Sequence, residues 1–292
     1  MKGDAMTKLL YLECTSGISG DMCAAALLDA GASEEAVRRA LESLPVEGFA
    51  VEISRVKKSG LDVCDFSVVL DAAHENHDHD MAYLHGHGGA SEHGHGHDHD
   101  RDHGRAHDHD HAHGAPGGNH HRGPAEIAQI IDGAAMTDGA KAIAHRMFGF
   151  VADAEARAHG VPVGEVHFHE VGAVDSIADI IAIAVAADDL APDGVVVSDL
   201  PCGYGTVRCQ HGLIPVPAPA TAFIAEAAGL TLSPVDVEGE LVTPTGAAAA
   251  AALRTEAALP ERFSIKAIGM GAGKRAYDTP GILRAMIIEP AE

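Results

Sequence analysis

A tract rich in histidine and aspartate, from His74 to His121, interrupts a chain whose remaining sequence has the composition of a folded protein. This histidine tract holds sixteen of the 21 histidines, and large apolar side chains are almost absent from it. Because so little apolar burial cannot offset the entropy of ordering a chain, we expect the tract to be disordered without metal. The 244 residues outside it are enough for one large domain or two small ones.

The composition of the histidine tract indicates metal handling. Neutral imidazole suits nickel, copper and zinc, and the interleaved carboxylates add hard oxygen donors. Neither a zinc-finger nor an HExxH pattern occurs, and alternate histidines on an unstructured chain suit capture and storage better than catalysis. The candidate storage ligands are His95, His97, His99, His107, His109, His111 and His113. The alternative is a solvated linker, for which Gly, Ala and Ser would suffice.

Charge and composition narrow the class of partner. The formal net charge is −23, which disfavours nucleic acid and anionic membranes and favours small cations. Aromatic residues make up only 4%, with no Trp, so the core must be built from Ala, Val, Ile and Leu. Five widely spaced cysteines without a CxxC pair argue against disulfides, and no apolar run is long enough to span a membrane. We expect a cytoplasmic protein.

The sequence before the histidine tract predicts a strand, a loop, two helices and a hairpin. Residues 8–13 form an apolar run typical of a buried strand, and Asp21 opens a helix after it. The loop between them contains Ser16, Gly17, Ser19 and Gly20. Such a loop at a helix N-terminus can cradle an anion, although it matches neither the P-loop nor the dinucleotide fingerprint, and a tight turn is the alternative. Alternation around Ser59-Gly60 predicts the hairpin.

After the tract, Pro124 and Asp138 are placed to start two helices. Further on, His167 and His169 have strand spacing, Glu170 turns the corner, and Asp175 with Ser176 is expected to cap an apolar helix. Two histidines and a carboxylate above a helix N-terminus can form a metal or phosphate site, whereas a structural role for the histidines is the alternative.

The last third predicts a strand, a Cys/Gly-rich loop and further elements. Cys202, Cys209 and His211 place soft and borderline donors in and after that loop. Helices are expected at 220–228 and after Thr243, and strands at 264–270 and 282–288. The predicted fold class is mixed α/β (α+β), with one mixed sheet and Ala-rich helices. Residues 6–73 and 122–290 would form this body, with 74–121 as a disordered metal-binding insertion.

Four motifs occur in order around the histidine tract: GISGDM, HFHEVGAVDSIADI, PCGYGTVRCQHGLIPVPAPAT and GELVTPTGAA. Together they resemble the LarC family, the nickel insertion proteins of nickel-pincer cofactor biosynthesis, over roughly residues 9–284. The resemblance implies a lyase-type nickel chelatase, or cyclometallase, that uses CTP and inserts nickel into pyridinium-3,5-bisthiocarboxylic acid mononucleotide. The product, with one nickel–carbon and two nickel–sulfur bonds, is the cofactor of lactate racemase and related enzymes.

The resemblance also implies partners. Full-length family members continue beyond the equivalent of Ile288 into a domain associated with CTP binding. We expect a separately encoded companion to supply it; the alternative is that this chain is inactive by itself. Other expected partners are the mononucleotide substrate and a lactate racemase-type apoenzyme that receives the cofactor, and we expect an oligomer. Glu13 departs from the Asp that the family usually has before the Cys, which keeps the charge but changes its reach.

Roles follow from the chemistry of nickel insertion laid over the resemblance. Nickel is assigned to His167, His169 and Glu170, with Asp175 and His211 as weaker candidates, and a divalent ion to Asp21. Phosphate or nucleotide contacts would come from Ser16, Gly17, Ser19, Gly20 and Thr245. The general base is undetermined. Two other functions stay open: a non-catalytic nickel metallochaperone or store, and a metal-dependent hydrolase or transferase in which the tract is incidental.

Overall fold

A six-stranded mixed sheet forms the centre of the protein in the computed structural model, which describes residues 7–70, 122–166, 168, 174–209 and 212–291. The strand order is β2-β3-β9-β10-β1-β4. These strands are β1 (Leu9–Glu13), β2 (Phe49–Lys58), β3 (Leu61–Leu70), β4 (Gly194–Val197), β9 (Phe263–Ala272) and β10 (Ile282–Pro290). β1 runs parallel to β4 and antiparallel to β10, and β3 meets β9 in parallel. The predicted mixed α/β class is therefore confirmed, and strands from both sides of the histidine tract share one sheet.

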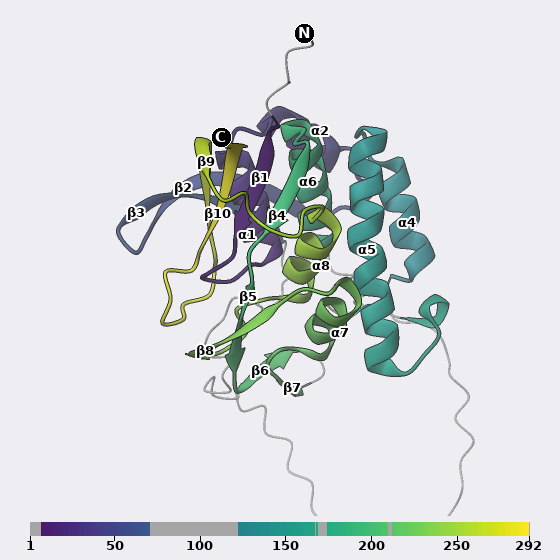
Figure 1. The fold of residues 1–292 in the computed structure, drawn as a ribbon. Helices are drawn as coiled ribbons and strands as arrows, with labels where there is room; N and C mark the ends of the chain where they lie inside the picture. The colour runs from purple at the N-terminus through teal and green to yellow at the C-terminus, as the bar shows by residue number, and fades with distance from the viewer. Residues whose placement is uncertain (1–6, 71–121, 167, 169–173, 210–211, 292) are drawn as a thin grey trace, which may run out of the picture.

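The helices gather in layers on one side of this sheet (Figure 1). They are α1 (Gly20–Asp29), α2 (Glu34–Glu42), α4 (Pro124–Gly133), α5 (Asp138–His159), α6 (Val174–Leu190), α7 (Pro219–Ala228) and α8 (Pro244–Leu253). α1 packs directly on β9, β3 and β10, α6 packs on α1, and α5 packs on α6 and α8. Within the described ranges, none of these helices has the length and unbroken apolar character that crossing a bilayer requires.

The core has the aliphatic character that the composition predicts. Among the described residues, Phe66 is the only aromatic one in the group of largest fully buried side chains, and Ala247, Ala248, Ala249 and Ala250 of α8 are completely buried. Small residues also bring α1 close to the sheet. A Cβ atom on Gly271 of β9 would lie only 2.0 Å from the carbonyl oxygen of Met22 in α1. Helix and sheet backbones therefore touch at a distance that only glycine permits.

Several local predictions are confirmed. The hairpin turns at Ser59-Gly60 between β2 and β3, which pair in antiparallel register. Ser33 caps α2 by accepting a hydrogen bond from the Ala36 N–H, Pro124 begins α4, and Asp138 begins α5 after the Thr137 cap. These features are encoded locally, by turn and cap residues next to the elements they delimit.

The Cys/Gly-rich segment is a correction, because most of the predicted loop is sheet. β5 (Leu200–Tyr204) pairs in parallel with β8 (Leu232–Glu238), and β6 (Thr206–Cys209) forms a hairpin with β7 (Gly212–Pro215). A Cβ on Gly203 would lie 2.2 Å from the Gly239 carbonyl oxygen. This glycine therefore permits close approach of two chain segments, and the sequence interpretation mistook it for a loop residue.

The segment before α6 is a second correction. A short 3-10 helix spans Val163–Glu165, and the buried Phe168 packs edge-on against Phe148 with ring centroids 5.3 Å apart. α6 begins at Val174, so Asp175 lies in its first turn and not at its cap. His167, His169 and Glu170 lie outside the described residues.

Candidate functional site

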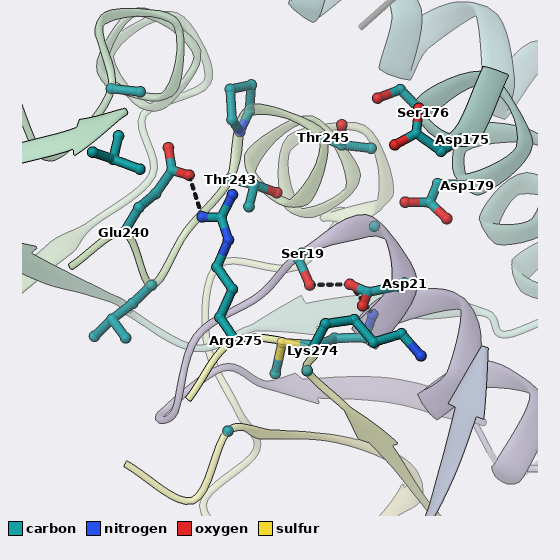
Figure 2. A pocket seen from close by; sticks show the side chains of 18 of the residues that line it. Ser19, Asp21, Asp175, Ser176, Asp179, Glu240, Thr243, Thr245, Lys274 and Arg275 are labelled. Carbon is teal, nitrogen blue, oxygen red and sulfur yellow. Dashed lines mark hydrogen bonds and ion pairs between the residues drawn. The ribbon is translucent and has the colours of Figure 1, made fainter. Parts of the chain in front are cut away.

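A pocket lies where the N-terminal ends of α1, α6 and α8 meet the loop between β9 and β10 (Figure 2). The polar and glycine residues that line it include Ser16, Ser19, Gly20, Asp21, Asp175, Ser176, Asp179, Arg208, Cys209, Glu240, Thr243, Thr245, Lys274, Arg275 and Tyr277. Helix N-termini carry unpaired N–H groups and the positive end of the helix dipole. Three of them at one pocket favour a ligand with negative charge.

The glycine loop after β1 forms one wall of this pocket and is fixed by its backbone. The Ile18 N–H donates to the Leu241 carbonyl oxygen at 3.0 Å, and the Thr243 N–H donates to the Ile18 oxygen at 3.2 Å. Gly17 has φ of 110°, and a Cβ there would lie 2.4 Å from the Leu241 oxygen. The loop and the N-terminus of α8 therefore form one rigid seam.

Three carboxylates define the acidic side of the pocket: Asp21 in the first turn of α1, and Asp175 and Asp179 one turn apart on α6 (Figure 2). Asp21 Oδ1 accepts hydrogen bonds from Ser19 Oγ and, at 2.8 Å, from the Met22 N–H. Its Oδ2 is buried and has no hydrogen-bond partner within the described part of the chain. A Cβ on Gly20 would lie 2.2 Å from Asp179 Oδ2, so glycine is what lets α1 approach this carboxylate.

The acidic side is electrostatically strained. Burial, followed by the nearby charges of Asp21 and Asp175, raises the pKa of Asp179 well above its usual value, against the opposing effects of Lys274 and the Asp21 N–H. Like charges held together in this way are typical of sites that bind a cation. No three His, Cys, Asp or Glu side chains in the described ranges are already placed as a metal-ligand set. A metal at this position would therefore need further ligands or a small side-chain movement.

The basic side of the pocket consists of Arg208 from β6 and of Lys274 and Arg275 from the β9–β10 loop, residues 273–281. Arg275 Nη1 pairs with Glu240 Oε2 at 2.6 Å, and Lys274 pairs with Asp65. Lys58 supports the loop from the β2–β3 hairpin, and burial is the main cause that lowers its pKa. Positive charge is thus concentrated beside the carboxylates in a chain that is acidic overall.

The structure brings together most of the described residues that the sequence singled out. Ser16, Ser19, Gly20, Asp21, Asp175, Thr245 and Cys209 all line the pocket, and Gly17 supports its wall. Cys202 does not line it. His167, His169, Glu170, His211 and the tract histidines His95, His97, His99, His107, His109, His111 and His113 lie outside the described residues.

Sequence reasoning missed Asp179, Glu240, Lys274, Arg275 and Tyr277. One signal was available for Asp179, because it follows Asp175 at the i, i+4 spacing that places both on one helix face. The other four carry no local signal. Lys274, Arg275 and Tyr277 reach the pocket because β9 and β10 are placed beside β1 by long-range pairing, whereas Glu240 lies in the segment between β8 and α8.

The fold and the pocket define a mixed α/β protein in which helix N-termini, basic side chains and carboxylates line one pocket. The chain belongs to the nickel insertion protein family, whose description, "Nickel insertion protein", matches residues 10–292.

Three similar proteins are each named pyridinium-3,5-bisthiocarboxylic acid mononucleotide nickel insertion protein. The relative from Alkaliphilus metalliredigens is 47% identical over 97% of this chain and 61% of its own length. The relative from Geobacillus kaustophilus is 37% identical over 97% and 60%, and that from Staphylococcus epidermidis is 34% identical over 97% and 60%. The chain thus spans about three fifths of the length of these relatives. No solved structure shows significant similarity to it.

Proposed function

We propose that this chain acts in the insertion of nickel into pyridinium-3,5-bisthiocarboxylic acid mononucleotide, as the chelatase or cyclometallase of nickel-pincer cofactor synthesis. The observation that carries the proposal is one pocket that joins carboxylates to basic side chains and helix N-termini, in a member of the nickel insertion family. The names of the relatives supply the substrate. We further propose that the reaction is cytoplasmic, uses CTP through a companion domain, takes place in an oligomer, and supplies a lactate racemase-type apoenzyme.

The reaction sets clear demands on the pocket. A ring carbon exchanges its proton for nickel: the C–H electron pair becomes the carbon–nickel bond, the proton passes to a base, and both thiocarboxylate sulfurs coordinate the ion without a change of oxidation state. The nickel must therefore be held by exchangeable ligands next to the ring. The anionic groups of the substrate must also be oriented.

The proposed ligands follow these demands. Nickel would be held by His167, His169 and Glu170, with Asp175 and His211 as further donors, and Asp21 would hold a divalent ion. Asp179 joins this set because it lies on α6 close to both Asp21 and Asp175, on the same acidic side of the pocket. Phosphate contacts would come from Ser16, Gly17, Ser19, Gly20 and Thr245, at or beside the N-termini of α1 and α8.

Product formation tests the proposal directly. The chain is incubated with nickel, CTP and the thiocarboxylated mononucleotide, with and without the companion domain, and the nickel product is sought by mass spectrometry. We expect product with the companion and only nickel binding without it. A full-length relative serves as the positive control. If the relative makes product and the supplemented chain does not, the proposed function is wrong; product from the chain alone removes only the requirement for the companion.

The histidine tract is proposed as a nickel store that feeds this site. Because ligating imidazoles must be neutral, and free histidine titrates near pH 6.5, the number of ions bound should fall steeply as the pH drops toward about 5. We expect at least two ions per chain by calorimetry at neutral pH, on the order of one per three or four imidazoles. A variant in which a Gly/Ser linker of equal length replaces residues 74–121 should lose these ions but keep insertion at saturating nickel. Fewer than two ions in the intact chain, or binding that ignores pH, contradicts storage.

A further inference from the structure

The β9–β10 loop holds Arg275 in a fixed position at the pocket. The Gly273 N–H donates to the Gly281 carbonyl oxygen at 2.9 Å and closes the base of the loop. Lys58 Nζ donates to the carbonyl oxygens of Gly273 and Arg275, at 2.5 and 3.1 Å. These contacts fix the backbone on which the arginine is carried, so its ordering does not have to be supplied by a ligand.

Glu240 fixes the guanidinium itself. Its side chain is only 7% exposed, and the 2.6 Å ion pair with Arg275 is one of the least exposed in the described part of the chain. Arg275 also donates a hydrogen bond to the phenolic oxygen of Tyr277, and burial is the main cause that raises the pKa of this tyrosine. A Cβ on Gly239 would lie 2.2 Å from Tyr277 Cε1, so the tyrosine ring can occupy this position only because residue 239 has no side chain. Buried ion pairs contribute little net stability, so this one is better explained by what it positions.

A guanidinium in this setting is suited to bind a phosphate. It carries five N–H donors in a planar fork, so pairing with Glu240 and Tyr277 is compatible with an anionic ligand as well. Thr243 and Thr245, at the N-terminus of α8, line the same pocket. Arg208 adds positive charge to the same pocket, in a chain with 43 acidic and only 20 basic residues.

Arg275 and the carboxylates of α1 and α6 lie on opposite sides of the pocket (Figure 2). In Figure 2, Arg275 and Glu240 lie on one side, Ser19 and Thr243 lie between, and Asp21, Asp175 and Asp179 lie on the other side, with Lys274 beside Asp21. A ligand with a phosphate at one end and a metal-binding group at the other would match this separation. A pyridinium mononucleotide has that form, with its thiocarboxylates on the ring and its phosphate at the far end of the ribose.

We propose that Arg275, positioned by Glu240, binds the phosphate monoester of the mononucleotide, which directs the thiocarboxylated ring toward the acidic side of the pocket. The identity of the ligand rests on the proposed function, whereas the phosphate subsite rests on the residues themselves. Arg275 is the binding residue, and Glu240 is a positioning residue that acts through it.

Binding measurements with and without the phosphate test this subsite. Calorimetry compares the mononucleotide, the corresponding nucleoside without phosphate, and inorganic phosphate on the wild type and on Arg275→Gln. We expect the variant to bind the mononucleotide about 10- to 100-fold more weakly, the range for a lost charged hydrogen bond. Nucleoside binding should change by less than about threefold, within the effect of a distant surface change. Arg39→Gln, which removes an exposed ion pair with Glu35 on α2, is the matched control and should change neither affinity.

Glu240 is tested by graded replacement. Glu240→Ala should lose the phosphate-dependent part of the affinity, and Glu240→Gln, which keeps the acceptor oxygen, should recover part of it. A merely structural glutamate would weaken nucleoside and mononucleotide alike. Cooperative urea unfolding of every variant is required before its affinities are compared.

The outcomes separate this inference from the proposed function. If inorganic phosphate binds in an Arg275-dependent manner but the thiocarboxylated mononucleotide does not bind, the subsite stands and the proposed function fails. If the mononucleotide binds and accepts nickel with no dependence on Arg275, the function stands and the subsite is wrong. Equal weakening of nucleoside and mononucleotide in Arg275→Gln also overturns it.

Discussion

Asn in place of Asp179 is expected to stabilise the metal-free protein and to reduce nickel insertion by about 10- to 100-fold, the range for removing a partner of a metal site. The substitution keeps an oxygen that can accept the hydrogen bond from the Asp21 N–H. It removes one negative charge from the acidic side of the pocket. Stability and activity should therefore move in opposite directions, as expected when charges are held together for function.

The ionisation of Asp179 determines whether the substitution raises or lowers the free energy of unfolding. Burial and then the charges of Asp21 and Asp175 raise the pKa of Asp179, so the folded state binds its proton more tightly than the unfolded state. The free energy of unfolding therefore falls as the pH rises from the ordinary carboxyl pKa, near 4, to the raised pKa of the folded protein. This loss of stability is complete at a pH above the raised pKa and absent at a pH below the ordinary carboxyl pKa. Asp179→Asn should therefore be more stable than wild type at neutral pH and equal to it near about pH 4.

Urea denaturation of chelator-treated protein across this pH range measures the difference. Asp153→Asn, the same replacement at an exposed position of α5, is the control and should stay within about 0.5 kcal/mol of wild type in stability, with unchanged insertion. An Asp179→Asn protein that is less stable at neutral pH, or fully active, would show that the acidic side is neither strained nor used.

Local signals predicted much of the fold. Ser33 as a cap, Ser59-Gly60 as a hairpin turn, and the apolar strands at both ends of the chain all depend on neighbouring residues, and each appears as expected. The failures depend on distant residues. β5 is a strand because β8 pairs with it from about thirty positions away, and no periodicity within 200–204 records that partner.

Two interpretations were offered for the glycine loop, an anion cradle and a tight turn, and its residues are compatible with both. Gly17 is required by the Leu241 carbonyl oxygen, and Gly20 by the approach of Asp179, so packing alone explains both glycines. The tight-turn alternative is thus sufficient for their presence. Anion binding by the loop stays a prediction, supported by its place at a pocket where Arg275 and two other helix N-termini also lie.

The basic side of the pocket could not be predicted in the same way. Lys274 and Arg275 follow β9, more than 250 residues after the glycine loop they face, and the intervening order of strands places them there. Antiparallel pairing of β10 with both β9 and β1 brings the β9–β10 loop to the end of β1 from which the glycine loop starts. That juxtaposition is a property of topology, which a single sequence does not reveal.

Alanine at Gly246 is expected to disrupt the seam between α8 and the glycine loop. Alanine normally favours a helix over glycine by about 1 kcal/mol. Here its Cβ would lie 2.2 Å from the Ile18 carbonyl oxygen and 2.9 Å from Ser19 Cα. These are backbone atoms of a loop already fixed by hydrogen bonds to Leu241 and Thr243, so they cannot move cheaply. We expect a net loss of about 1–3 kcal/mol in the free energy of unfolding, the usual cost of overpacking.

Gly149→Ala provides the matched control, because Gly149 lies inside α5 and a Cβ there would meet nothing within 4 Å. The same chemical change should stabilise the protein at this position by up to about 1 kcal/mol. Opposite signs in urea denaturation would assign the loss at Gly246 to the seam and not to alanine itself. Because the seam carries Ser19 and the N-termini of α1 and α8, Gly246→Ala should also weaken binding of inorganic phosphate, while Gly149→Ala should not. If Gly246→Ala is as stable as Gly149→Ala and binds phosphate normally, the loop is free to shift and the pocket is not held by this contact.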